Sequence, residues 1–313
     1  MVFESIDVLD KPVPVQSVNT QWLYETGVSL DILRLDELDP EISGNKWFKL
    51  KHNFIEAQRG GRSTILSFGG AWSNHIHALA ATGQRFGMPT IGIIRGEPGE
   101  SLSATLTDAV NWGMQLHYLS RSDYRRKNEV VFLHHLLHQL GLPAQEVHVV
   151  PEGGSNSLGV QGCCEILAAG GASLGSYDEI WLACGTGATL SGVALAASKD
   201  MPETRVTGVA VLKGGDFLRN DIDKHTIQSL DNWRLLTDYH HGGYARITKE
   251  LLAFIKSFES ETAIPLDPVY TGKVMFAIWY SLTENLKQGL PCRGKRLLMI
   301  HTGGLQGRRG IKI

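Results

Sequence analysis

The strongest constraint on the fold is the alternation of short apolar runs with helix-length segments along most of the chain. Apolar, strand-like runs occupy residues 63–68, 90–95, 115–120, 146–151, 178–184, 205–211 and 296–302. Segments of helical length lie between them, at about 73–86, 103–113, 125–141, 157–169 and 189–198. Strands that alternate with helices pair in parallel through right-handed crossovers. The sequence therefore predicts an α/β fold with parallel-rich sheets flanked by helices on both faces.

The chain length and its least regular stretch indicate how this fold is organised. With 313 residues the chain is long enough for two domains of ordinary size. Residues 213–244 lack the alternation, and their sequence predicts long loops on a functional face.

Composition excludes several classes of protein. The formal net charge is −2 and no basic stripe is present, so we expect no nucleic-acid partner. The apolar stretches are far shorter than the roughly 20 residues that a membrane span needs, and the first residues do not resemble a secretory signal. The four cysteines are Cys163, Cys164, Cys184 and Cys292, and their spacing fits neither a zinc site nor a disulfide framework. We expect reduced thiols, no metal, and a cytoplasmic location.

The first segment with chemical meaning is Ser43-Gly44-Asn45-Lys46-Trp47-Phe48-Lys49. A lysine amine becomes a nucleophile when partial burial lowers its pKa, and it can then form a Schiff base with a carbonyl compound. Lys46 is the best candidate because it follows directly on a Ser-Gly-Asn turn. The alternative is an ordinary surface lysine with a buried stem.

Two further segments each place a glycine-rich turn between a strand and a helix. Gly69–His75 contains Ser73 and Asn74, which can cap the helix or bind a carboxylate or phenolic oxygen at its N-terminus. Cys184–Gly192 reads CGTGATLSG, and successive backbone N–H groups in such a turn form a nest for an anion. Its spacing fits neither a dinucleotide fingerprint nor a P-loop. A single phosphate monoester, held by backbone groups without an essential lysine or arginine, fits it better.

The last two segments are Leu266–Lys273, which reads LDPVYTGK, and His301–Gly304, which reads HTGG. Each can also be read as an ordinary loop or turn without a function. Neither identifies a function by itself.

Taken together and in this order, the five segments resemble those of the fold-type II, tryptophan-synthase-β-like enzymes that use pyridoxal 5′-phosphate (PLP). The resemblance spans about residues 43–304 and is to the branch that contains 1-aminocyclopropane-1-carboxylate (ACC) deaminase and D-cysteine desulfhydrase. It implies a homodimer and two α/β domains with PLP in the cleft between them. Residues 1–49 and 149–313 would form the larger domain, and residues 50–148 a smaller inserted one.

The resemblance also implies roles for individual residues. Lys46 would carry PLP, Asn74 would bind the cofactor's ring oxygen, and Ser73 would face the substrate. Tyr270 and Tyr244 match two active-site tyrosines. The phosphate would lie on Gly185, Thr186, Gly187, Ala188 and Thr189.

Three departures from the branch bear on the substrate. ACC deaminases have a glutamate beside the pyridine nitrogen where this chain has Thr271. A neutral hydroxyl makes PLP a weaker electron sink, which suits loss of a good β-leaving group better than opening of a strained ring. Trp72 and the tail Leu305–Arg309 are the other two departures, and both are expected to reshape the substrate pocket.

The resulting hypothesis is a PLP-dependent lyase that acts on a small amino acid, first D-cysteine, and yields pyruvate, ammonia and sulfide. ACC deaminase is the alternative enzyme, and a non-catalytic ligand-binding relative is the alternative from another class. Retention of Lys46 argues against the last of these, because a binding protein has no use for a nucleophilic amine at this position.

Overall fold

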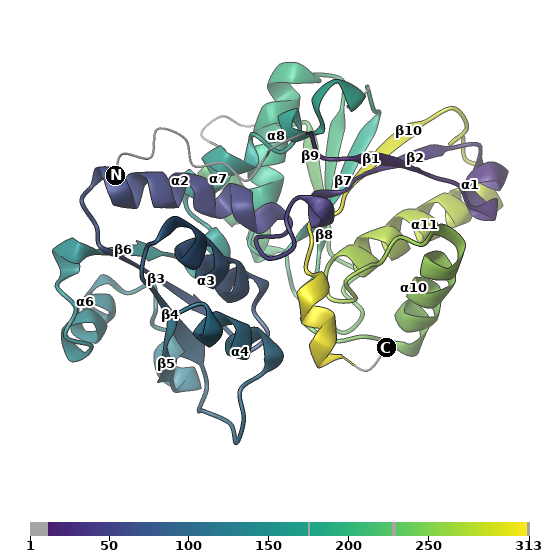
Figure 1. Ribbon diagram of the computed structural model, residues 1–313. Coiled ribbons are helices and arrows are strands. Elements are labelled where there is room, and N and C mark those ends of the chain that lie inside the picture. The colour runs from purple at the N-terminus through teal and green to yellow at the C-terminus, as the bar shows by residue number, and fades with distance from the viewer. Residues whose placement is uncertain (1–11, 175, 227–229, 312–313) are drawn as a thin grey trace.

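Ten strands form two separate sheets in the computed structural model, which describes residues 12–174, 176–226 and 230–311 (Figure 1). The larger sheet has the order β1-β2-β10-β7-β8-β9, and only the β1–β2 pair is antiparallel. Its strands are β1 (Val15–Val18), β2 (Ser29–Leu33), β7 (Glu179–Cys184), β8 (Arg205–Ala210), β9 (Trp233–Leu236) and β10 (Arg296–Ile300). The predicted α/β fold is confirmed.

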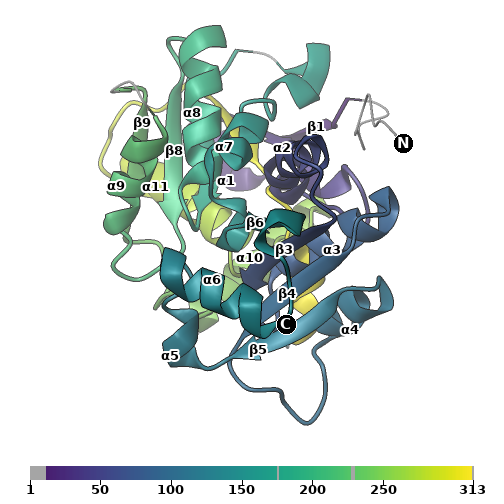
Figure 2. The same cartoon turned by 90° about the vertical axis from the view of Figure 1, so that its left-hand side faces the viewer.

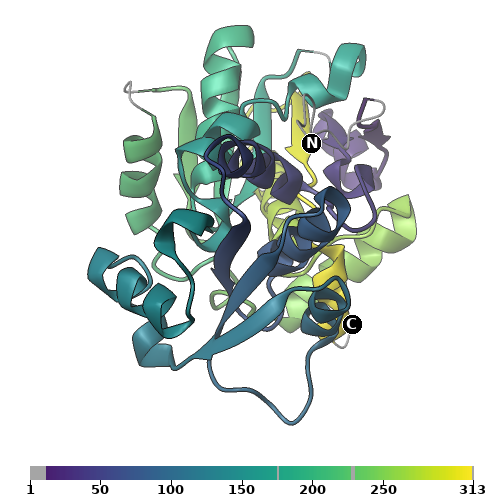
Figure 3. The ribbon, with the colours of Figure 1, turned by 60° about the vertical axis from the view of Figure 1, so that its left-hand side comes forward.

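The smaller sheet is wholly parallel and has the order β5-β4-β3-β6. Its strands are β3 (Thr64–Gly69), β4 (Thr90–Arg95), β5 (Gln115–Leu119) and β6 (Val147–Val150). This sheet and its helices make up the lower left of Figure 1 and lie in front in Figure 3. A chain with two α/β domains requires two sheets. The exact boundaries of the smaller domain, near residues 50 and 148, stay a prediction.

Helices cover both sheets and provide the apolar faces that the strands need. They are α1 (Gln21–Thr26), α2 (Asn45–Arg59), α3 (Asn74–Phe86), α4 (Ala104–Asn111), α5 (Arg121–Tyr124), α6 (Val130–Gln139), α7 (Ser157–Cys163), α8 (Ala188–Asp200), α9 (Phe217–His225), α10 (Lys249–Thr262) and α11 (Thr271–Lys287). Successive residues of a strand point to opposite faces. Accordingly Trp181 and Ala183 join one core cluster of the larger sheet, and Leu182 joins the other.

Helix α7 packs between α2, which contacts the smaller sheet, and α8, which contacts the larger sheet (Figure 2). The contact with α2 is close at Gly162, where a Cβ atom would lie 1.8 Å from the carbonyl oxygen of Phe48. No helix in the described ranges is both long and apolar enough to cross a membrane.

Three sequence expectations were wrong in detail, and one of them is the helix expected at about 157–169, which ends at Cys163. Residues 213–244 are not only loops, because they contain α9 and β9. Leu218 and Ile222, four residues apart, are the buried face of α9, and β9 is a four-residue edge strand paired with β8. The helix expected from residue 125 begins at Val130, because residues 125–129 form turns after the short helix α5.

Candidate active site

A cavity of about 840 Å³ lies where the parallel strands of both sheets end. The segments after β3, β6, β7 and β10 and Arg95, the last residue of β4, contribute to its wall, as expected for a ligand site in open parallel sheets. The structure brings nine sequence-predicted residues to this wall: Lys46, Ser73, Asn74, Gly185, Thr186, Gly187, Thr189, Tyr244 and Tyr270. Ala188 and Thr271 do not line it.

Lys46 is held in the first turn of α2, inside the cavity. The preceding Gly44 has φ 72°, and a Cβ there would lie 2.2 Å from the carbonyl oxygen of Thr302, so only glycine fits. The Nζ of Lys46 donates to Asn45 Oδ1 at 2.7 Å. Withdrawal of the amine from bulk water, and second the charge of nearby Lys49, lower the pKa of Lys46 to about 7. At neutral pH a large fraction of this amine is therefore unprotonated and nucleophilic.

Lys49 also lines the cavity, and the sequence analysis did not select it. Its side chain is 4% exposed, and its Nζ lies 3.4 Å from Thr186 Oγ1 in the glycine-rich turn. Burial lowers its pKa too. Its position three residues after Lys46 was the available signal, because residues at that spacing share a helix face.

The glycine-rich turn between β7 and α8 faces this amine. Gly187 precedes α8 with φ 85°, and no side chain caps the helix. The first N–H groups of a helix have no partner within the helix and favour an anion. Thr189 Oγ1 accepts from Asn45 Nδ2 at 2.8 Å, which ties the turn to the residue beside Lys46.

The opposite wall is the start of α3. Ser73 caps this helix, because its Oγ accepts from the backbone N–H of Ile76 at 3.3 Å. His75 also lines the cavity, and its Nε2 lies 2.8 Å from Ser67 Oγ. Burial, followed by the charges of Lys46 and Lys49, lowers the pKa of His75 to about 3, so the ring is neutral.

Tyr244 and Tyr270 form a hydrogen-bonded pair on the cavity wall. The Tyr270 hydroxyl donates to the Tyr244 hydroxyl at 3.2 Å, and the rings pack edge to face. Burial raises the pKa of both phenols, so both keep their protons at neutral pH. Because Tyr270 donates to Tyr244, the hydroxyl proton of Tyr244 is available to donate to another group.

Thr271 is placed differently from the sequence expectation. Its side chain is fully buried, and its hydroxyl accepts from the backbone N–H of Asp267 at 2.7 Å. Asp267 in turn accepts from the N–H groups of Val269 and Tyr270, and burial raises its pKa to about 7. Thr271 thus braces the turn that presents Tyr270 and does not reach the cavity.

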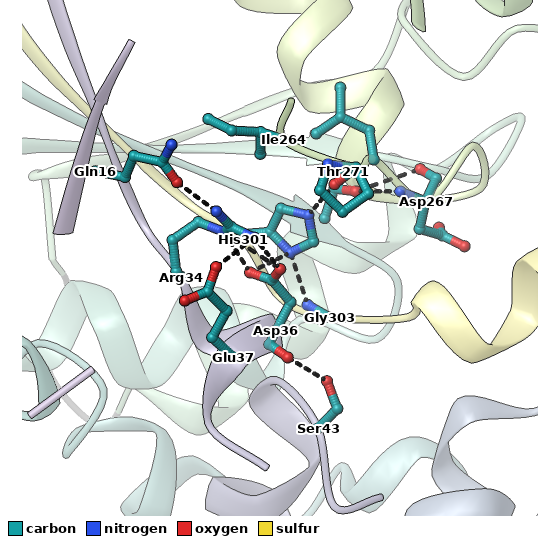
Figure 4. A network of polar contacts seen from close by, with 12 residues as sticks. Gln16, Arg34, Asp36, Glu37, Ser43, Ile264, Asp267, Thr271, His301 and Gly303 are labelled. Atoms are coloured by element: carbon teal, nitrogen blue, oxygen red, sulfur yellow. Dashed lines mark hydrogen bonds and ion pairs between the residues drawn. The ribbon is translucent and has the colours of Figure 1, made fainter. Parts of the chain in front are cut away.

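A buried polar network lies directly behind the cavity wall (Figure 4). His301 Nε2 donates to the carbonyl oxygen of Pro265 at 2.8 Å, and its Nδ1 lies 3.1 Å from Asp36 Oδ1. Arg34 binds the same carboxylate through two nitrogens. Asp36 also accepts, through its carbonyl oxygen, from Ser43 at 3.3 Å. The network therefore joins three segments that continue into the cavity wall, at Asn45–Lys46, at Tyr270 and at Thr302–Gly304.

These features define an enzyme that can hold a phosphorylated carbonyl cofactor on a lysine. The amine, the helix N-terminus and a second lysine lie in one cavity and supply the donors that such a cofactor needs. Residues 23–303 match the family described as pyridoxal-phosphate dependent enzyme. The chain belongs to this PLP-dependent family.

Relatives with named activities cover nearly the whole chain. It is 30% identical to the bifunctional, mitochondrial D-cysteine desulfhydrase/ACC deaminase of Arabidopsis thaliana, over 95% of this chain and 77% of that protein. It is 27% identical to a D-cysteine desulfhydrase of Yersinia pestis, over 96% and 94%. The crystal structure of an ACC deaminase homologue matches with a TM-score of 0.80 at 25% identity, over 97% of this chain and 92% of that one.

Proposed function

We propose that this enzyme carries PLP on Lys46 and cleaves D-cysteine to pyruvate, ammonia and sulfide. The observation that carries the proposal is the Lys46 amine, which lies inside the cavity with its pKa lowered to about 7. The D-cysteine desulfhydrase relatives support the choice of reaction.

The residues present fit the phosphate of the cofactor. The uncapped N-terminus of α8 offers backbone donors from the 185–189 turn, including Ala188, which is otherwise behind the wall. Lys49 would add a positive charge beside Thr186, in addition to the backbone donors expected from the sequence. Asn74, at the start of α3, would bind the cofactor's ring oxygen.

When bound, PLP withdraws electrons from the α-carbon of the substrate. The start of α3, with Ser73, is the place for the substrate carboxylate, because a helix N-terminus favours an anion there. When the amino group of the substrate occupies the cofactor, the free Lys46 amine would accept the α-proton at Nζ. The Cβ–S bond then breaks with its electron pair going to sulfur. The released aminoacrylate reacts with water to give pyruvate and ammonia.

The two tyrosines stay neutral and can direct a hydrogen bond at the leaving group. Tyr270 donates to Tyr244, so Tyr244 holds the proton available to sulfur. Sulfide is a good leaving group, and a positioned donor is enough to assist it.

The lack of a buried carboxylate among the described lining residues of the cavity favours elimination over ring opening. Glu152 and Asp221 are the carboxylates among its described lining residues; their side chains are 43% and 42% exposed and are paired with Lys127 and Lys224. The buried Asp267 lies behind the wall, so the described lining holds no buried carboxylate to protonate the pyridine nitrogen. Thr271 does not bear on this choice, because its hydroxyl binds the Asp267 backbone. ACC deaminase stays the second candidate, because relatives carry both names.

One set of measurements tests the proposal. The purified protein should show a visible absorption band, and borohydride reduction should label the peptide that contains Lys46. Pyruvate release should be fastest with D-cysteine among D- and L-cysteine, D- and L-serine and ACC. Efficient turnover of ACC without sulfide release from D-cysteine would make ACC deaminase the correct name, and a colourless, unlabelled protein would indicate a non-catalytic relative.

We further propose a homodimer in the cytoplasm. Family resemblance supports the dimer, and four free cysteines support a reducing compartment. Light scattering of the purified protein measures the first directly: a monomeric mass at micromolar concentration contradicts it.

A further inference from the structure

The C-terminal turn η5 (Leu305–Gly310) is anchored to both parts of the molecule. It follows the cavity-lining residues 302–304 and lies between α4 and α10 (Figure 1). Arg309 binds Asp108 on α4 with an N–O distance of 2.6 Å. Arg308 binds Glu259 on α10 through two nitrogens, at 2.6 and 3.1 Å. The turn therefore bridges the smaller sheet's helices and those of the larger sheet.

Trp72 packs against the end of the same turn. A Cβ built on Gly310 would lie 2.7 Å from Cδ2 of the Trp72 ring. Neither Trp72 nor any residue of η5 is among the described residues that line the cavity. Trp72 and η5 therefore form one structural unit, which can affect the cavity only through a neighbouring residue.

That neighbour is Asn74, and the direction of each hydrogen bond leading to it can be derived. Gln306 Oε1 accepts from the Thr105 hydroxyl at 2.8 Å and from Arg309 at 3.2 Å. A guanidinium has only donors, so the Gln306 amide oxygen must face it. Gln306 Nε2 is left to donate to Asn74 Oδ1.

This chain of bonds fixes the Asn74 amide as well. Its Oδ1 is occupied by Gln306, so the Nδ2 donor is the atom available to the cavity. Nδ2 lies on the side of Gly304, where a Cβ atom would come within 3.0 Å of it, and Gly304 lines the cavity.

We propose that Gln306 is a positioning residue that holds Asn74 with its Nδ2 donor toward the cavity, for the ring oxygen of the cofactor. The inference rests on the role proposed above for Asn74. A flipped amide would present Oδ1 to that oxygen and place two acceptors in contact. Gln306 does not line the cavity and acts only through Asn74.

The test inverts the hydrogen bond while keeping the shape of the side chain. Gln306→Glu stays paired with Arg309 but presents an acceptor to Asn74, which must turn its Nδ2 away from the cavity. We expect cofactor affinity to fall by roughly tenfold or more, and the visible absorption maximum to shift. Gln306→Met, which only removes the donor, should lower affinity by about fivefold. Equilibrium dialysis of PLP and absorption spectra measure both effects without any turnover assay.

Gln139→Glu is the matched control, since it makes the same change at an exposed position on α6 and should leave both readouts as in the wild type. The decisive comparison is a double-mutant cycle with Asn74→Ala. If Gln306 acts through Asn74, Gln306→Glu has almost no further effect in the Asn74→Ala protein. An effect of equal size in both backgrounds overturns the proposal. Asn74→Ala with wild-type affinity and spectrum instead refutes the role of Asn74 itself. Gln306→Met keeps the test available if the glutamate variant does not fold.

Discussion

Lys46 and Lys49, one turn apart on α2, carry most of the chemistry that the cavity can perform. A free amine is required to capture the carbonyl group of the cofactor. The rate of covalent PLP uptake by the apoenzyme should therefore rise with pH through a midpoint near 7, where Lys46 loses its proton. Stopped-flow absorbance at pH 6 to 9 measures this midpoint. A rate that still rises without levelling at pH 9, as for an amine with the ordinary lysine pKa of 10.5, would show that the amine is not buried as described.

Replacing Lys49 with methionine separates its two effects on the site. Loss of the positive charge beside the 185–189 turn should weaken PLP binding by about tenfold. Loss of a like charge should also raise the pKa of Lys46, because Lys49 is one of the causes that lower it. The uptake midpoint therefore moves to higher pH.

Lys51→Met is the control on the same helix. Lys51 does not line the cavity, and its Nζ lies 2.8 Å from a carboxylate oxygen of Glu165. It should leave both the affinity and the midpoint unchanged. An unchanged midpoint in Lys49→Met would mean that its amine lies too far from Lys46 to matter.

Residues that follow a strand were predictable from the sequence, whereas residues placed by tertiary contacts were not. Ser73 and the 185–189 turn follow β3 and β7, and parallel strands end at one edge of a sheet. Gln306 depends on packing between distant segments, which leaves no local pattern. Thr271 does not line the cavity, because its hydroxyl accepts from the backbone N–H of Asp267, four residues earlier in the chain.

At the scale of elements, the contact between α2 and α7 sets the position of both lysines. A methyl group on Gly162 would meet the Phe48 carbonyl oxygen at 1.8 Å, and backbone cannot move aside cheaply. Gly162→Ala should lower the free energy of unfolding by about 3 kcal/mol and also weaken PLP binding, because α2 must shift. Urea unfolding and PLP titration measure the two effects.

Gly99→Ala is the control for this prediction, because Gly99 is exposed and a Cβ there meets nothing closer than 3.4 Å. Its free energy of unfolding should stay within about 0.5 kcal/mol of the wild type. A Gly162→Ala protein as stable as this control would show that α7 can move away from α2 without cost.

The elements themselves were predictable where apolar runs were long and continuous. Strands β3, β4 and β7 are buried on both faces, so their sequences are mostly apolar. Strand β9 has four residues and one buried side chain, and α9 has two buried residues among charged ones. Such short signals are lost among polar neighbours, and pairing with β8 decides the structure instead.

For the whole molecule, six histidines make stability fall in acid. His75, His77 and His301 are buried and His148, His225 and His241 are half-buried, and withdrawal from water is the largest cause that lowers the pKa of each. Between the folded and unfolded pKa values the unfolded chain binds more protons, so stability falls as pH drops below about 6.5. Asp267 has the opposite sign. Its raised pKa, about 7, means that the folded state holds the extra proton, which adds stability as pH falls from 7 toward 4.

Two substitutions should therefore change the acid dependence in opposite directions. His75→Gln removes a group whose folded pKa is about 3, so the fall in stability between pH 6 and 4 becomes shallower by close to one proton, or about 1.4 kcal/mol per pH unit. Asp267→Asn removes the opposing group, so the fall becomes steeper over the same range. Urea unfolding of the apoenzyme at pH 4, 5, 6 and 7 measures each slope. Equal slopes for the two variants and the wild type would mean that neither side chain changes its protonation on unfolding, and that acid acts elsewhere in the molecule.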